Sequence, residues 1–121
     1  MCTAISLEGK YHLFGRTLDV DNDYGQEVCV LPKNSRVEFC HQPSIEKHPA
    51  ILGMGVKFQD KRLFFDGVNE NGLCAAALNF PLYAVYHNAR KDKINIASYE
   101  FITYILCNCN SVDDKLHIKE S

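Results

Sequence analysis

Cys2 is the first candidate for chemistry, because a thiol and an α-amine on one residue can act together. Removal of an initiator Met before a small residue would leave Cys2 at the start of the chain. An α-amine has a pKa near ~8 and a free thiol near ~8.5, so neither is far from neutrality. The amine can accept the thiol proton and later pass it to a leaving amine. Cys2 is therefore a candidate nucleophile, and a plain small buried residue is the alternative.

Arg16 and Asp19 are charged residues that could act on Cys2. Apolar stretches at 3–7 and 11–18, joined by a turn at 8–10, predict a β-hairpin. This hairpin would bring both side chains near the chain start. A guanidinium favours a thiolate, and a carboxylate can hold an ammonium group. The alternative is a surface ion pair at the end of a strand.

Asn79 directly follows an apolar run at 73–78, and its amide could donate to an oxyanion. The alternative is an Asn that caps the turn before Phe80 and Pro81. The five histidines are dispersed along the chain and predict no Cys–His pair. The segment Asn71-Gly72 is typical of a turn with positive φ.

Composition and charge exclude several classes of partner. A net charge of −2 with scattered cations gives no electrostatic reason for binding nucleic acid or an anionic membrane. No apolar run reaches the roughly 18 residues of a membrane span, and the start has no signal-peptide pattern, so we expect a cytoplasmic protein. A zinc site would need paired CxxC motifs, whereas only Cys107 and Cys109 are closely spaced. We therefore expect no metal.

The elements that would position these residues predict an α+β fold. Ser98 is a plausible N-cap of the clearest helix, with Glu100 in its first turn. Ser111 and Asp114 suggest the start of a second helix. A single complete helix covers apolar strands poorly, so the sequence predicts a domain cut short. Further strands are expected at 28–31, 50–58, 62–66 and 73–78, surface or loop segments at 33–49 and 86–95, and a buried helix face at Phe101, Ile102, Ile105, Leu106 and Cys109.

Taken together, these motifs resemble the choloylglycine hydrolase family of bile salt hydrolases and penicillin V acylases. Each motif alone is weak, but their order along almost the whole chain, to about residue 115, is highly specific. The segments that carry the resemblance are Met1-Cys2-Thr3-Ala4-Ile5, Phe14-Gly15-Arg16-Thr17-Leu18-Asp19, Asp66-Gly67-Val68-Asn69-Glu70-Asn71-Gly72-Leu73, Ala77-Leu78-Asn79-Phe80-Pro81, 94–102 and 111–114.

The resemblance implies an N-terminal nucleophile hydrolase fold, an αββα sandwich of which residues 1–121 would form the N-terminal portion of a single domain. It implies hydrolysis of the amide bond of glycine- or taurine-conjugated bile salts, without metal or organic cofactor, by a homo-oligomeric full-length protein. Cys2 matches the nucleophile, Arg16 and Asp19 match the residues that tune its thiol and amine, and Asn79 matches an oxyanion-side residue.

Two alternatives stay open within and beyond this resemblance. Penicillin V acylase is the second activity of the family, because the substrate pocket cannot be read from one sequence. Family members are longer and carry a further active-site Asn and Arg downstream, and residues 116–121 no longer resemble them. A non-catalytic truncated remnant or small-molecule-binding module is therefore the other alternative.

Overall fold

The structure, a computed structural model, describes residues 1–114 as a β-hairpin, a larger antiparallel sheet and a helix. This mixture of strand and helix agrees with the α+β class expected from sequence. The elements are β1 (Ala4–Leu7), β2 (Leu13–Arg16), β3 (Glu27–Leu31), β4 (Ile51–Phe58), β5 (Lys61–Phe64), β6 (Asp66–Asn69), β7 (Cys74–Ala76), the 3₁₀ turn η1 (Ser98–Glu100) and α1 (Phe101–Asn108).

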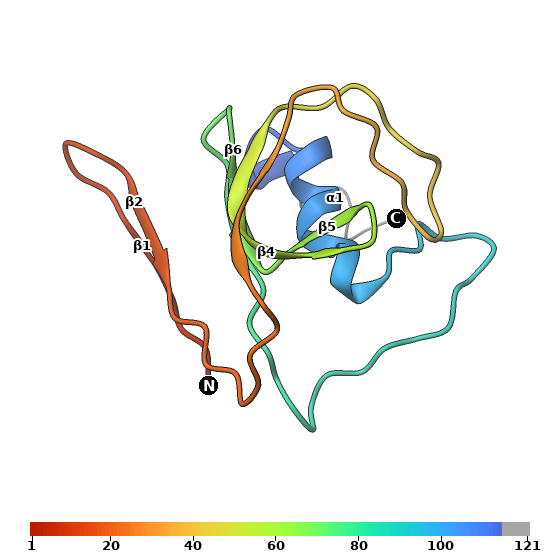
Figure 1. Ribbon diagram of the computed structural model, residues 1–121, viewed down its shortest axis with the longest axis horizontal. Helices are drawn as coiled ribbons and strands as arrows, with labels where there is room; N and C mark the ends of the chain where they lie inside the picture. Colours follow the sequence, from red (N-terminus) through yellow and green to blue (C-terminus); the bar gives the residue numbers. More distant parts are fainter. Residues whose placement is uncertain (115–121) are drawn as a thin grey trace.

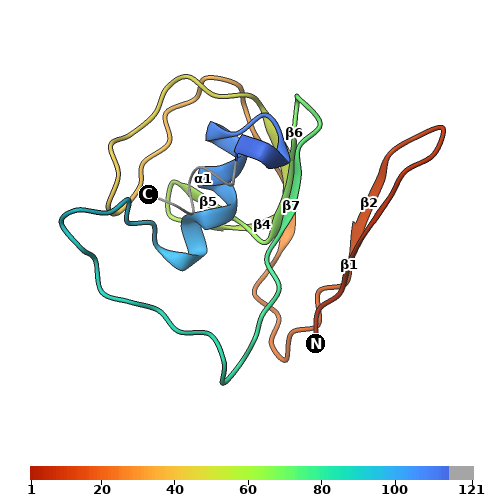
Figure 2. The same ribbon diagram turned by 180° about the vertical axis from the view of Figure 1, so that it is seen from behind.

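The predicted hairpin is confirmed as a separate two-stranded sheet. Strand β1 pairs antiparallel with β2, and Ala4 lies opposite Arg16. The pairing continues past the strands, because the Thr17 amide donates to the Thr3 carbonyl (2.8 Å) and the Thr3 amide donates to the Thr17 hydroxyl (3.0 Å). The hairpin stands on the side of the larger sheet opposite α1, and its turn points away from the rest of the chain (Figures 1 and 2).

The larger sheet has the order β3-β4-β6-β7, with β5 also paired to β4. One edge of β4 is shared: Ile51 and Leu52 pair with β6, whereas Gly55 to Phe58 pair with β5. Gly53 lies where the partner changes, and a Cβ there would collide with the carbonyl oxygen of Asp66. Only glycine therefore allows the backbones of β4 and β6 to approach this closely.

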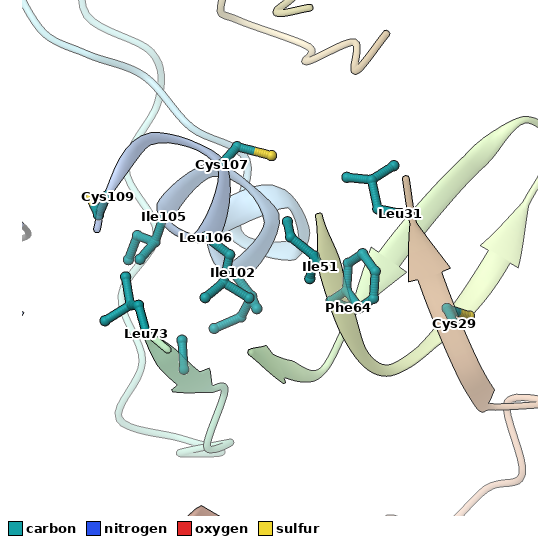
Figure 3. Packing of buried hydrophobic residues seen from close by; sticks show 11 residues of the cluster. Cys29, Leu31, Ile51, Phe64, Leu73, Ile102, Ile105, Leu106, Cys107 and Cys109 are labelled. Atoms are coloured by element: carbon teal, nitrogen blue, oxygen red, sulfur yellow. The ribbon is translucent and has the colours of Figure 1, made fainter. Parts of the chain in front are cut away.

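Helix α1 packs on one face of this sheet and encloses the core (Figure 3). Leu106 is fully buried, as expected from the helical pattern, but Phe101 is 43% exposed, which corrects its predicted place on the buried face. Strand β3 shows the alternation of a half-buried strand, since Cys29 and Leu31 face the core while Val28 and Val30 are exposed. The buried apolar residues are Cys29, Leu31, Ile51, Phe64, Leu73, Ala75, Ile102, Ile105, Leu106, Cys107 and Cys109.

The start of the helical segment differs from the prediction. Ser98 is not an N-cap: it begins η1 after Ala97, and no side chain caps the turn. Glu100 is 3% exposed; both of its carboxylate oxygens accept the Cys40 amide at 3.2 Å, and one lies 3.4 Å from the Lys61 ammonium. A buried carboxylate is stable only with such partners, so Glu100 fastens the 33–49 segment and β5 to the helix.

Other sequence predictions are met in part. Residues 112–114 begin a helical turn whose Asp114 carboxylate accepts the amide of Ser111 (3.1 Å), as the capping pattern predicted. Strand β7 is shorter than expected, ending at Ala76.

The 33–49 segment does not lie wholly on the surface as predicted, because Val37 and Ile45 form an isolated β-bridge and pack against the core. No helix within residues 1–114 is long and apolar enough to cross a membrane, and the prediction for 116–121 lies outside the described residues.

Asn69 joins the turn after β6 to the end of α1. It is 2% exposed, and its amide nitrogen donates to the carbonyls of Leu106 (3.0 Å) and Cys109 (2.9 Å). Its amide oxygen accepts the backbone N–H of Asn71 (3.1 Å) and Leu73 (3.0 Å). One side chain thus satisfies buried carbonyls at the helix C-terminus, where no intrahelical donor exists, and also shapes the turn.

The substitution Asn69→Ala should destabilise the protein by about 2–3 kcal/mol, because it leaves buried backbone groups without partners. Urea unfolding followed by circular dichroism would measure the free energy of unfolding. The matched control is Asn108→Ala, which removes an exposed side-chain amide that donates to the Tyr104 carbonyl within α1. Equal and small losses of unfolding free energy in both variants would contradict the stabilising role of the Asn69 hydrogen bonds.

Candidate active site

The chain start lies against Asp19. The Asp19 carboxylate is 3.7 Å from the Met1 ammonium, and the Cys2 sulfur is 3.9 Å from the Asp19 carbonyl oxygen. Strand β2 ends at Arg16, so the backbone at 17–19 no longer follows strand alternation. Asp19 can therefore turn toward Cys2, while Arg16 turns toward the larger sheet.

Arg16 is nearly buried, with 6% of its side chain exposed. Its Nη2 donates to the carbonyl oxygen of Ala77, which directly follows β7, and its Nη1 lies 3.7 Å from the Asp66 carboxylate at the start of β6. Within residues 1–114, Nε and Nη1 have no hydrogen-bond partner. The guanidinium thus bridges the hairpin and the larger sheet beside the chain start.

Asn79 lies two residues beyond Ala77 and is exposed. Its backbone lowers the pKa of the Cys2 thiol. The structure therefore brings the main chain of Asn79 near Cys2, whereas the sequence analysis pointed to the side-chain amide of Asn79.

The surroundings of Cys2 lower its pKa from the ordinary thiol value. The main cause is the Asp19 backbone; the Asn79 backbone, the Arg16 charge and the terminal ammonium act in the same direction. Partial desolvation opposes them without reversing the shift. The arrangement favours a thiolate, which is the nucleophilic form of cysteine.

All four residues predicted from the sequence are thus gathered at the chain start. The sequence reasoning missed Asp66 and the Ala77 carbonyl, which hold Arg16 from the larger sheet. Asp66 is the first residue of the 66–73 motif, and the sequence contains no other indication of its contact with Arg16. A backbone carbonyl group cannot be recognised from sequence. Among residues 1–114, no group of three or more His, Cys, Asp or Glu side chains is placed to hold a metal ion.

The pH–rate profile of Cys2 alkylation by iodoacetamide should have its midpoint below that of the urea-unfolded chain. The reason is the lowered pKa, which leaves more of the thiol as thiolate near neutral pH. Peptide mass spectrometry would resolve the individual cysteines. Cys107 is the internal control, since burial raises its pKa to about 12 and it should stay unlabelled while the protein is folded. Identical midpoints for folded and unfolded Cys2 would contradict activation by the site.

Solved structures of bile acid hydrolases superimpose closely on this chain. A cysteine-to-alanine mutant of the conjugated bile acid hydrolase from Clostridium perfringens matches with a TM-score of 0.88 and 36% identity, covering 98% of this chain and 37% of that one. An arginine-to-leucine variant of the same enzyme gives a TM-score of 0.88 and 33% identity. These matches confirm the expected N-terminal nucleophile hydrolase fold, and they cover little more than a third of each solved chain.

Curated relatives agree with the structural matches. A bile salt hydrolase/transferase from Clostridium perfringens is 39% identical over 118 residues, and one from Lactiplantibacillus plantarum is 36% identical over 112 residues. The matched segments are 94% and 93% of this chain but 36% and 35% of those proteins, so it spans little more than a third of their length. The family model for linear amide C–N hydrolases of the choloylglycine hydrolase family matches residues 2–120. The chain therefore belongs to the choloylglycine hydrolase family.

Proposed function

We propose that this chain carries the nucleophile of an amidase that hydrolyses glycine- or taurine-conjugated bile salts. The observation that supports it is the Cys2 thiol near the chain start, which lies 3.9 Å from the Asp19 carbonyl and whose pKa is lowered by the backbones of Asp19 and Asn79 and by the Arg16 charge. A thiol with a lowered pKa beside an α-amine is the arrangement that nucleophilic amide cleavage requires.

Removal of Met1 is the first step that this proposal needs. Met1 is 98% exposed, so an aminopeptidase can reach it. The Asp19 carboxylate, which lies 3.7 Å from the Met1 amine, would then be close enough to hold the new ammonium of Cys2. Asp19 is thus proposed to orient the amine that serves as base.

In the acylation step, the Cys2 sulfur attacks the amide carbonyl carbon and its proton passes to the α-amine. The carbonyl oxygen becomes an oxyanion, to which Asn79 is proposed to donate. When the C–N bond breaks, the α-ammonium returns the proton to the nitrogen, and glycine or taurine leaves. Sulfur keeps the acyl group as a thioester.

In the second step, water attacks the thioester carbonyl and gives its proton to the α-amine. Collapse of the intermediate expels the sulfur and releases the free bile acid, and the enzyme regains its starting form. No cofactor takes part in either step. Arg16 stabilises the thiolate whenever it is the leaving or attacking group.

The activities for which the relatives are named favour a bile salt as the substrate. The curated relatives reported above are bile salt hydrolases, and the solved neighbours are conjugated bile acid hydrolases. Penicillin V acylase is not favoured by these names. Because the chain covers about a third of its relatives, activity is best tested with the remainder of the family domain present.

Replacing the matching segment of the Clostridium perfringens enzyme by this chain should give a chimera that hydrolyses glycocholate. The substitution Cys2→Ala in the chimera should reduce turnover by at least about 10⁴-fold, since no other group replaces the nucleophile. Release of glycine, read by an amine assay, measures the rate, and intact mass shows whether Met1 has been removed.

Two controls make this experiment decisive. Cys40→Ala, at an exposed cysteine outside the site, should leave turnover unchanged. Penicillin V, offered to the same chimera, should be hydrolysed more slowly than glycocholate. Full turnover by the Cys2→Ala chimera would refute the nucleophile, and a preference for penicillin V would refute the substrate class.

A further inference from the structure

We infer that Asp66 is a positioning residue that holds the Arg16 guanidinium near the chain start and thereby contributes to the reactivity of Cys2. The inference rests on the proposed function of Cys2, but its evidence is the geometry around Arg16.

The buried charge of Arg16 needs a partner of opposite charge. Only 6% of its side chain is exposed, and a buried cation is costly unless an opposite charge lies nearby. Among the acidic groups of residues 1–114, Asp66 alone lies within 4 Å of the guanidinium, at 3.7 Å. The Ala77 carbonyl supplies a hydrogen bond but no counter-charge. The place of the guanidinium therefore depends on Asp66.

Asp66 itself is fixed by the larger sheet. Its Oδ1 accepts the backbone N–H of Met54 at 2.9 Å, and its side chain is 16% exposed. Met54 lies where β4 changes partner from β6 to β5, so its amide is free to bond with a side chain. Gly53, the adjacent residue, permits the close approach of the Asp66 backbone. The carboxylate is thus held on one side by β4 and faces Arg16 on the other.

The same contacts connect the hairpin to the segment that ends in Asn79. Ala77 accepts from Arg16, and its own amide donates to the Phe65 carbonyl at 2.9 Å, next to Asp66. The hairpin carries Cys2, and the backbone of Asn79 is close enough to lower the pKa of the Cys2 thiol. Displacement of Arg16 would therefore remove a positive charge from Cys2 and loosen the junction that brings Asn79 to it.

The test is the alkylation of Cys2 in Asp66→Asn, an isosteric change that removes the charge. We expect the midpoint of the pH–rate profile to rise by about half a unit, which leaves about threefold less thiolate at neutral pH. Asp66→Glu keeps a carboxylate but displaces it, so its midpoint should lie between those of the unaltered chain and of Asp66→Asn. In an Arg16→Gln background, Asp66→Asn should add nothing further, because it acts through the guanidinium.

Two controls separate positioning from loss of structure. Asp60→Asn, the same change at an exposed acid in the turn after β4, should leave the midpoint in place. Labelling of Cys107 reports unfolding, and if Asp66→Asn exposes it, the comparison of Asp66→Glu with the unaltered chain decides instead. An unchanged midpoint overturns the inference. So does a lowered midpoint, which would mean that Asp66 acts on the thiol only as a nearby negative charge.

Failure of this inference and failure of the proposed function give different results. Alkylation requires no turnover, so an inactive chimera whose Cys2 midpoint rises in Asp66→Asn would refute the activity but keep the positioning role. An active chimera whose midpoint is insensitive to Asp66 would refute the positioning role and keep the activity.

Discussion

The buried guanidinium of Arg16 is the contact on which the arrangement of the candidate site depends. Among residues 1–114, strands β1 and β2 pair only with each other, and Figures 1 and 2 show their hairpin standing apart from the larger sheet. Arg16 crosses this gap to Ala77 and Asp66. Because a charge in this place is costly without its partners, the same interaction that carries charge to Cys2 also fixes the hairpin.

Buried polar side chains serve a similar purpose in the rest of the molecule. Asn69 fastens the turn after β6 to the end of α1, and Glu100 fastens β5 and Cys40 to the start of the helical segment. Each satisfies backbone groups that the ladders and helix leave unpaired. Strand β6 is thus held at both ends, by Asn69 against α1 and by Asp66 against β4. This explains how a strand of four residues can provide a fixed anchor for Arg16.

Local patterns allowed much of this fold to be predicted from sequence. The hairpin, strands β3 and β4 and the Gly72 turn with φ +86° follow from alternation and turn chemistry. The Ser98 cap and the burial of Phe101 were wrong, because a 3₁₀ turn precedes α1 and the first residue of the helix, Phe101, is exposed. Cys2, Arg16, Asp19 and Asn79 could be named from motif order. Asp66 could not, because its role arises from a long-range contact with Arg16 that no spacing encodes.

Asp19 acts both on the Cys2 thiol and on the amine at the chain start. Its backbone is the main cause of the lowered pKa of the Cys2 thiol, whereas its carboxylate lies 3.7 Å from the Met1 amine. These two effects use different atoms, so they are separable in principle. A change of side chain alters the field at the amine, while the hydrogen bond at the sulfur depends on the path of the backbone after β2. That path is set by the Thr3–Thr17 pairing and by the anchoring of Arg16. The pKa of the Cys2 thiol therefore depends on the fold of the hairpin, whereas the electrostatic field at the amine depends on the Asp19 carboxylate.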